Sequence, residues 1–287
     1  MALSLAERLG HPADARLLIV NCDDLGSSHS ANLATLRAFD AGVATSATLM
    51  VPCPWAREAA RMFAGRDVGV HLTLTCEYPG YRWRSLTGAA SLHDADGFMP
   101  ATIAEVFAAA DPDDVRAECR AQIDQAIGWG VDPTHLDSHM GTVQLHGPFF
   151  DIYLDLAAEY DLPLRMAGRR EDERLGFGGR ARAAEMGLIF PENFISPWPR
   201  DTRQVFHDRI PGLAGGVSEI YAHPVEDGDE LRAYDPDHPE IRANDAEVLA
   251  DPAIAALMRS AGVTPISFRP LRALQRTENG GEAAGSL

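Results

Sequence analysis

The chain has 287 residues, of which 46% are hydrophobic, and its formal net charge is −17. That length and apolar content suffice for one large α/β domain, which we expect to span residues 1–276. The acidic surface would repel phosphate backbones and anionic membranes, so we expect neither nucleic acid nor a membrane as a partner. All 25 basic residues are arginine, which excludes Schiff-base and pyridoxal phosphate enzymes and lysine-bearing phosphate loops.

The cysteines and the N-terminal segment indicate the compartment. The four cysteines lie far apart and form no Cys-x-x-Cys pair, which argues against zinc knuckles and dithiol redox motifs. The first fourteen residues carry acids and Pro12 instead of a basic head and an apolar run, so no signal peptide is expected. No apolar stretch is long enough to span a bilayer. We therefore expect a cytoplasmic protein.

Short apolar runs alternate with amphipathic segments along most of the chain, a pattern typical of βα units around a parallel sheet or barrel. The predicted strands span residues 17–22, 47–51, 68–72, 135–138, 162–166, 217–222 and 264–268. The predicted helices span residues 32–41, 54–63, 113–127 and 150–160. The first three helices close on a glycine, as helices often do.

Three segments depart from this alternation. Residues 75–100 hold Tyr78, Trp83, three glycines and two prolines. This segment is too long for an ordinary connection and is predicted to be a lid or substrate loop. Residues 167–200 are rich in glycine and arginine, with Trp198 between two prolines. They are equally compatible with an irregular surface excursion and with a binding role. The small, polar tail at 277–287 is expected to be disordered.

Two adjacent carboxylates, Asp23 and Asp24, follow the first predicted strand. Active sites of α/β folds gather at the carboxyl ends of their strands. The alternative is a helix N-cap formed by Asp24 or a following serine. Because adjacent residues of a regular strand point to opposite faces, both carboxylates can reach one site only if the chain turns there. The Leu25-Gly26 step permits such a turn.

Three histidines stand at the ends of other predicted strands: His71, His139 and His223. Singly, each is more often a hydrogen-bonded core residue than a ligand. Parallel strands would bring all three to one rim with the two aspartates. One carboxylate and two imidazoles suffice to hold a catalytic divalent ion, and the remaining pair would supply a base and an acid. His135 lies deeper on its strand, and we interpret it as structural.

Five motifs in this order resemble the YdjC-like carbohydrate deacetylases, also called the ChbG/HpnK family. They span most of the chain, from Leu17 to Arg269. The motifs are Asn21-Cys22-Asp23-Asp24-Leu25-Gly26, Gly42-Val43-Ala44-Thr45-Ser46-Ala47-Thr48-Leu49-Met50, Val68-Gly69-Val70-His71-Leu72, Thr134-His135-Leu136-Asp137-Ser138-His139 and Glu219-Ile220-Tyr221-Ala222-His223-Pro224.

The resemblance implies a polysaccharide-deacetylase-like α/β fold, a distorted (β/α) barrel of about seven mostly parallel strands. It implies metal-dependent removal of an N-acetyl group from an amino sugar or a chitooligosaccharide-like glycan. The implied metal ligands are Asp24, His71 and His139. Asp23 would be the base and His223 the acid or oxyanion partner. Arg165 lies where related deacetylases carry an arginine near the base; it is a candidate substrate contact, with a surface or ion-pairing arginine as the equally favoured alternative. Glu219 is interpreted as structural, and a homodimer is possible.

Some details of the resemblance leave the substrate open. Many family members carry further histidines after the motif that ends in His139, whereas Met140-Gly141 follow here, so the sugar pocket can differ. Tyr78, Trp83 and Trp198 are candidates for stacking on a sugar ring, or for anchoring their loops. The metal is expected to be zinc or magnesium, although nickel, cobalt, manganese and iron suit the same ligands. Other amide or ester hydrolases and a non-catalytic sugar-binding protein are the alternatives.

Overall fold

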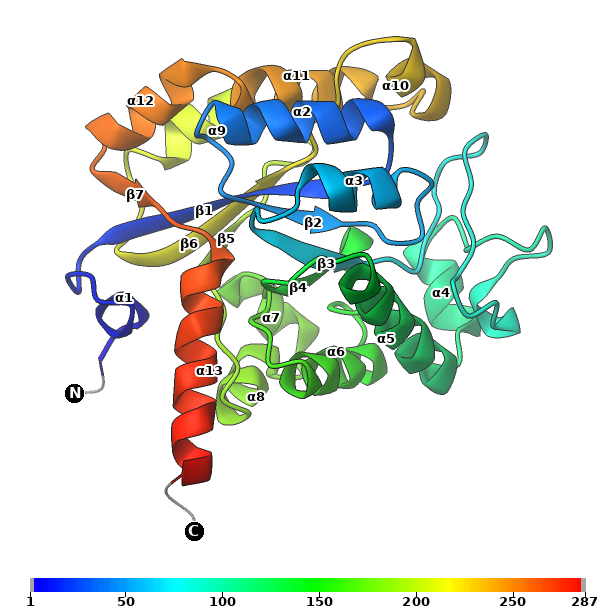
Figure 1. Cartoon of the computed structure of the whole chain (residues 1–287), viewed down its shortest axis with the longest axis horizontal. Helices are drawn as coiled ribbons and strands as arrows, with labels where there is room; N and C mark the ends of the chain where they lie inside the picture. The colour runs from blue at the N-terminus through cyan, green and yellow to red at the C-terminus, as the bar shows by residue number, and fades with distance from the viewer. Residues whose placement is uncertain (1–2, 285–287) are drawn as a thin grey trace.

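The computed structural model describes residues 3–284 and contains a seven-stranded sheet flanked by helices (Figure 1). The strands are β1 (Arg16–Leu25), β2 (Ser46–Leu49), β3 (Val68–Leu72), β4 (Leu136–Ser138), β5 (Asn193–Ile195), β6 (Gly216–Ala222) and β7 (Val263–Pro265). The helices are α1 (Leu5–Arg8), α2 (His29–Asp40), α3 (Ala56–Met62), α4 (Ile103–Ala109), α5 (Pro112–Gly128), α6 (Gly147–Glu159), α7 (Arg169–Leu175), α8 (Gly179–Glu185), α9 (Thr202–Arg209), α10 (Asp229–Tyr234), α11 (Pro239–Leu249), α12 (Pro252–Ser260) and α13 (Phe268–Ala284), with short 3-10 turns η1 (Ala90–Leu92) and η2 (His139–Gly141). Within these residues no helix is long and apolar enough to cross a membrane.

All strand pairs of the sheet are parallel, in the order β4-β3-β2-β1-β6-β5, and β7 pairs with the first residues of β1. The register aligns Cys22 with Ala222 and His71 with Asp137. The carboxyl ends of the strands therefore meet at one edge of the sheet. Figure 1 shows α2, α11 and α12 on one side of the sheet and α5, α6 and α13 on the other.

The sheet curls into a half-barrel of the α/β class, as predicted. The gap between β4 and β5 is filled by residues 162–166, which form one bridge at Leu164 instead of the predicted strand. The N–H of Arg165 donates to the carbonyl of Leu136 at 2.9 Å, and the N–H of Leu164 donates to the carbonyl of Ile189 at 3.0 Å. Pro163 has no N–H to continue a ladder, which limits this segment to a bridge.

The side chains on the inward-facing side of β1 change from apolar to polar along the strand. Leu17 and Ile19 belong to an apolar cluster with Phe268 of α13, whereas Asn21 and Asp23 follow them at the carboxyl end. Period-two alternation places these four side chains on one face. The barrel interior is therefore apolar at the bottom and polar at the rim, and His135 belongs to the lower part, stacked on Phe268 at 3.6 Å between ring centroids.

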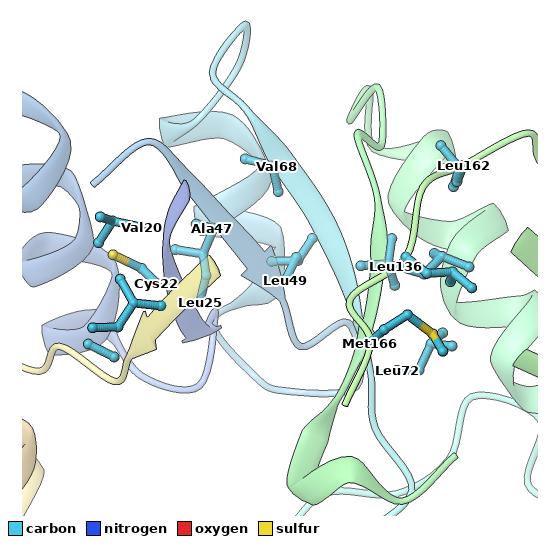
Figure 2. Close-up of a cluster of buried hydrophobic side chains, with 14 of the residues drawn as sticks. Val20, Cys22, Leu25, Ala47, Leu49, Val68, Leu72, Leu136, Leu162 and Met166 are labelled. Carbon is cyan, nitrogen blue, oxygen red and sulfur yellow. The ribbon is translucent and has the colours of Figure 1, made fainter. Parts of the chain in front are cut away.

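The opposite face of the sheet packs against the helices. Figure 2 shows part of this core, in which Val20, Leu49 and Leu136 are fully buried. Burying one such side chain contributes about 1.5–3 kcal/mol. This core fixes the strands on which the rim residues stand.

Two predicted segments differ from the structure. The tail expected to be disordered from Thr277 is helical as far as Ala284, because α13 continues through it. This helix is attached to the body by Arg8, whose Nε donates to Glu278 at 3.0 Å, and by Asn279, whose amide donates to Asp161 at 2.9 Å. Residues 285–287 lie outside the described residues. The irregular segment 167–200 contains α7, α8 and β5, because apolar contacts order it despite its weak periodicity.

Candidate active site

The two aspartates share the site because the chain turns between them. Asp24 has a φ of 60°, and the register of β1 against β2 shifts between Cys22 and Leu25. Gly26 completes the turn with a φ of 91°, and a Cβ there would lie 2.8 Å from the Cα of Ala56. The N-cap of α2 is the serine that follows, Ser28, which accepts from the N–H of Ala31 at 3.0 Å. The cap explanation for Asp24 is therefore wrong.

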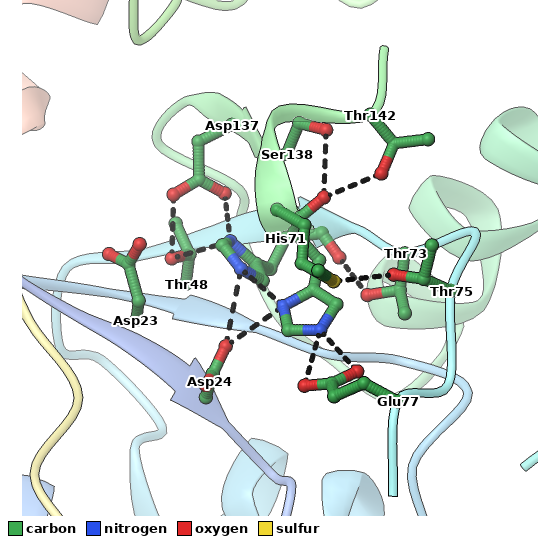
Figure 3. A network of polar contacts seen from close by, with 12 residues as sticks. Asp23, Asp24, Thr48, His71, Thr73, Thr75, Glu77, Asp137, Ser138 and Thr142 are labelled. Atoms are coloured by element: carbon green, nitrogen blue, oxygen red, sulfur yellow. Dashed lines mark hydrogen bonds and ion pairs between the residues drawn. The ribbon is translucent and has the colours of Figure 1, made fainter. Parts of the chain in front are cut away.

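Asp24, His71 and His139 bring three ligand atoms together (Figure 3). Asp24 Oδ1 lies 3.4 Å from His71 Nε2 and 3.1 Å from His139 Nδ1, and the two ring nitrogens are 3.3 Å apart. Bonds of about 2.0–2.1 Å to a tetrahedral zinc ion give ligand–ligand separations of roughly 3.3 Å. All three residues are buried. The donor set and its spacing therefore fit a divalent ion with positions left for water and substrate.

Both imidazoles are oriented by a second carboxylate. His71 Nδ1 donates to Asp137 at 2.6 Å, and His139 Nε2 lies 3.0 Å from Glu77 (Figure 3). Although burial opposes protonation, Asp137 raises the pKa of His71 to about 9, and Glu77 with Asp24 raises the pKa of His139 to about 10. Such outer carboxylates fix the ring orientation and make the ligand nitrogen more basic.

The second oxygen of Asp24 is held by Arg242 from α11. Arg242 Nη1 donates to Asp24 Oδ2 at 2.7 Å, and its other nitrogens donate to Asp235 and to the Tyr78 hydroxyl, each at 2.7 Å. Burial opposes ionisation of Asp24, but His139, His223 and Arg242 keep its pKa well below the usual range. Asp24 is therefore a carboxylate with one oxygen available to an ion.

Asp23 is held in a bidentate pair by Arg165. The two terminal nitrogens of Arg165 donate to the two Asp23 oxygens at 2.6 and 2.7 Å. Burial opposes ionisation, but Arg165 outweighs it and lowers the pKa of Asp23. Arg165 also donates from Nε to Glu219 at 2.7 Å and lies 2.9 Å from Asp137. Each of its nitrogens meets a carboxylate, so Arg165 lines the cavity as the ion-pair partner of Asp23.

His223 stands at the end of β6, on the same rim. Its backbone N–H donates to Asp245 at 2.8 Å, and its ring lies between Tyr221 and Trp198, with centroid distances of 5.2 and 5.0 Å. Burial, with Arg242 nearby, lowers the pKa of His223 to about 4. The ring is therefore neutral at pH 7.

A cavity of about 1020 Å³ opens above this rim. Its wall includes the five residues predicted to converge, which are Asp23, Asp24, His71, His139 and His223. Trp198 also lines it, as do Phe194 and Tyr221, which the sequence did not single out. A concave site with convergent titratable groups is the usual form of a catalytic pocket.

Tyr78 and Trp83 do not lie on this wall, which contradicts the sugar-stacking role expected of them. Their side chains are buried in a cluster with Tyr234, whose ring centroid is 5.0 Å from that of Tyr78. Trp83 Nε1 donates to the carbonyl of Thr75 at 2.9 Å. These aromatic rings anchor the 75–100 segment, from which Glu77 reaches His139.

Comparisons with known proteins agree with this architecture. The model of the YdjC-like protein family matches residues 17–260. The chain is 33% identical to a carbohydrate deacetylase of Geobacillus stearothermophilus, over 88% of this chain and 97% of that protein. It is 34% identical to a carbohydrate deacetylase of Thermus thermophilus, over 94% and 98%.

A solved structure shares the fold. It belongs to an Enterococcus faecalis protein described as a cellobiose-phosphate cleavage protein, and it matches with a TM-score of 0.77 at 23% identity, over 90% of this chain and 99% of that one.

The family match covers all five rim residues, from Asp23 to His223. The chain is therefore a member of the YdjC-like family.

Proposed function

We propose that this protein is a metal-dependent hydrolase that removes the acetyl group from an N-acetylated amino sugar. The observation that carries the proposal is the convergence of Asp24, His71 and His139 beside the Asp23–Arg165 pair, within one cavity. The names of the two bacterial relatives support carbohydrate as the substrate class.

Asp24, His71 and His139 would hold the ion. Their two nitrogens and one oxygen suit zinc, and waters in the open positions would complete a magnesium site. A divalent ion bound there lowers the pKa of a water molecule and polarises a carbonyl oxygen.

Asp23 would accept the proton of the attacking water. Its low pKa keeps it ionised, and the bidentate pair with Arg165 fixes the direction of its oxygens. The water oxygen bonds to the acetyl carbon, and the carbon–nitrogen bond of the amide then breaks. The products are acetate and the free amine of the sugar.

His223 would act on the opposite side of the amide. Its ring is neutral at pH 7, so it would first donate an N–H hydrogen bond to the oxygen that becomes negative. The leaving nitrogen needs a proton as its bond to carbon breaks. His223 would deliver it after taking up, on its other ring nitrogen, the proton that Asp23 accepted from the water.

The test is acetate release from N-acetylglucosamine and N,N′-diacetylchitobiose, with and without added divalent metal. We expect metal-dependent release, and loss of at least about 100-fold in kcat for Asp23→Asn, the scale of general base catalysis. Asp40→Asn is the matched control, because Asp40 is an exposed aspartate that also pairs with an arginine, Arg66. Failure of the metal-loaded protein to release acetate from either sugar would refute the substrate class.

A further inference from the structure

We propose that Met140 and Leu145 receive the acyl chain of the substrate, so that the protein also removes acyl groups longer than acetyl, such as butyryl. The inference rests on the proposed function and adds a second class of acyl group to it. We call these two residues the acyl patch. The reaction is otherwise unchanged: the water oxygen bonds to the acyl carbon, the carbon–nitrogen bond breaks, and the products are a short-chain carboxylic acid and the sugar amine.

The order of the strands gives the direction of the acyl chain. The proposed metal ligands stand at the ends of β1, β3 and β4, whereas His223 follows β6, on the other side of β1. In the proposed reaction the amide nitrogen faces His223. An amide is planar, so the acyl chain extends from the carbonyl carbon away from the nitrogen. It therefore runs along the rim toward the end of β4, where Met140 follows His139.

Met140 presents an apolar side chain to the cavity beside a proposed metal ligand. It is 42% exposed, and among the described residues it is the only exposed large apolar side chain on the cavity wall. Its φ of 51° lies in the left-handed region, which is unfavourable for a side chain of this size and is frequent at functional sites. The hydroxyl of Thr75 donates to Met140 Sδ at 3.4 Å. The fold thus holds an exposed thioether in a place that a bound hydrocarbon chain would cover.

Leu145 extends this apolar surface. It is half-buried and lines the cavity. A Cβ at Gly141 would lie 3.0 Å from Leu145 Cδ1, so the glycine lets the leucine pack closely against the turn that carries Met140. Ile103, the first residue of α4, is also half-buried and adds apolar surface to the same cavity. The cavity of about 1020 Å³ leaves room for an acyl chain longer than acetyl.

The polar side chains that neighbour the acyl patch in the chain already have backbone partners. Ser138, Thr142 and Gln144 each form a hydrogen bond with a backbone group, at 3.1, 2.8 and 2.8 Å respectively. A sugar ring buried against this surface would need partners for its hydroxyl groups, and an unpaired buried hydroxyl is unfavourable. An acyl chain has no such requirement. The acyl patch therefore suits a hydrocarbon chain better than a sugar.

The test compares N-butyrylglucosamine with N-acetylglucosamine in the metal-loaded protein. Each methylene group buried in an apolar site improves binding about fourfold, so two added groups should lower the KM about tenfold. Met140→Gln keeps the length of the side chain but makes it polar, and the ratio of the two KM values should fall to about threefold or less. Met186→Gln is the matched control, because Met186 is 41% exposed but lies outside the cavity wall. We expect it to keep the wild-type ratio.

Calorimetry supplies a second readout that needs no turnover. Butyrate should bind the metal-loaded protein about tenfold more tightly than acetate, and Met140→Gln should reduce this difference to about threefold or less. Equal KM values for the two substrates in wild type, or an unchanged ratio in Met140→Gln, would overturn the acyl patch. If butyrate binds with this dependence on Met140 but neither sugar releases its acid, the acyl patch stands and the proposed function fails.

Discussion

The contact between Glu77 and His139 allows a sharp test of the proposed metal site. Both Glu77 oxygens lie within 3.1 Å of His139 Nε2, and no other side chain contacts that nitrogen among the described residues. Glu77→Gln keeps the shape and an accepting oxygen but removes the negative charge. Loss of an outer-shell carboxylate of this kind typically weakens metal binding about 10- to 100-fold. That corresponds to about 1.4–2.7 kcal/mol.

Proton competition reduces this effect but does not reverse it. In the metal-free protein Glu77 and Asp24 raise the pKa of His139 to about 10, so an ion must displace a proton at pH 7.5. Glu77→Gln makes that displacement easier. It also removes a charge that stabilises a divalent ion more than a single proton, because Coulomb attraction scales with charge. We therefore expect a net loss toward the lower end of the range.

The assay is competition with a chromophoric chelator at pH 7.5, with metal content per chain measured in parallel. Glu58→Gln is a matched control, because Glu58 also contacts a histidine, His29, at 2.9 Å, and neither residue lines the cavity. We expect the affinity of Glu58→Gln to equal that of wild type. Unchanged affinity in a folded Glu77→Gln protein would show that His139 does not bind the ion as proposed.

Three further predictions concern stability. Burial raises the pKa of Glu219 to about 7 despite Arg165, so the folded state binds a proton more tightly than the unfolded state. Wild type should therefore lose more stability than Glu219→Gln between pH 5 and pH 8, as denaturant unfolding at the two pH values would show. The same loss in both proteins would contradict the assignment. Gly26→Ala should destabilise the fold by about 2 kcal/mol or more, since a Cβ meets Ala56 at 2.8 Å. Gly42→Ala is the control, because Gly42 also has a positive φ, 72°, but has open space around it. It should lower the free energy of unfolding by only about 1–2 kcal/mol. An equal loss of stability in the two variants would show that the contact with Ala56 does not matter. Removing metal with a chelator should lower the melting temperature, and adding it back should restore it, because an ion that binds the folded state stabilises it; a melting temperature insensitive to metal would count against the site.

The sequence indicates the strands and their ends because those depend on local pattern. Strand β3 begins and ends as predicted, at Val68 and Leu72, and three strand ends carry the histidines of the rim. Asp137 stands on β4, two residues before His139, but this spacing does not reveal its contact with His71 of the neighbouring strand. The segment 162–166 was predicted as a strand from its apolar residues, but it forms only one bridge, at Leu164. Apolar pattern alone therefore does not show whether a buried segment pairs along its whole length.

The residues that hold the proposed metal ligands in place, and the aromatic residues of the cavity wall, cannot be predicted from the sequence around them. Glu77 lies in a long loop without periodicity, and its position depends on aromatic rings that bury themselves elsewhere in that loop. Arg242 lies 218 residues from Asp24 in the chain, and nothing in the α11 sequence distinguishes it from an exposed arginine. Phe194 belongs to a strand of three residues, too short for alternation to reveal. Tertiary packing determines these placements.

The central claim is that Asp24, His71 and His139 bind one catalytic ion. The most direct measurement is anomalous X-ray diffraction from crystals of the zinc-loaded protein, recorded on both sides of the zinc absorption edge. We predict one strong anomalous peak per chain, about 2.0–2.2 Å from Asp24 Oδ1, His71 Nε2 and His139 Nδ1. A peak elsewhere, or no peak at these three atoms in protein that releases acetate, would contradict the account.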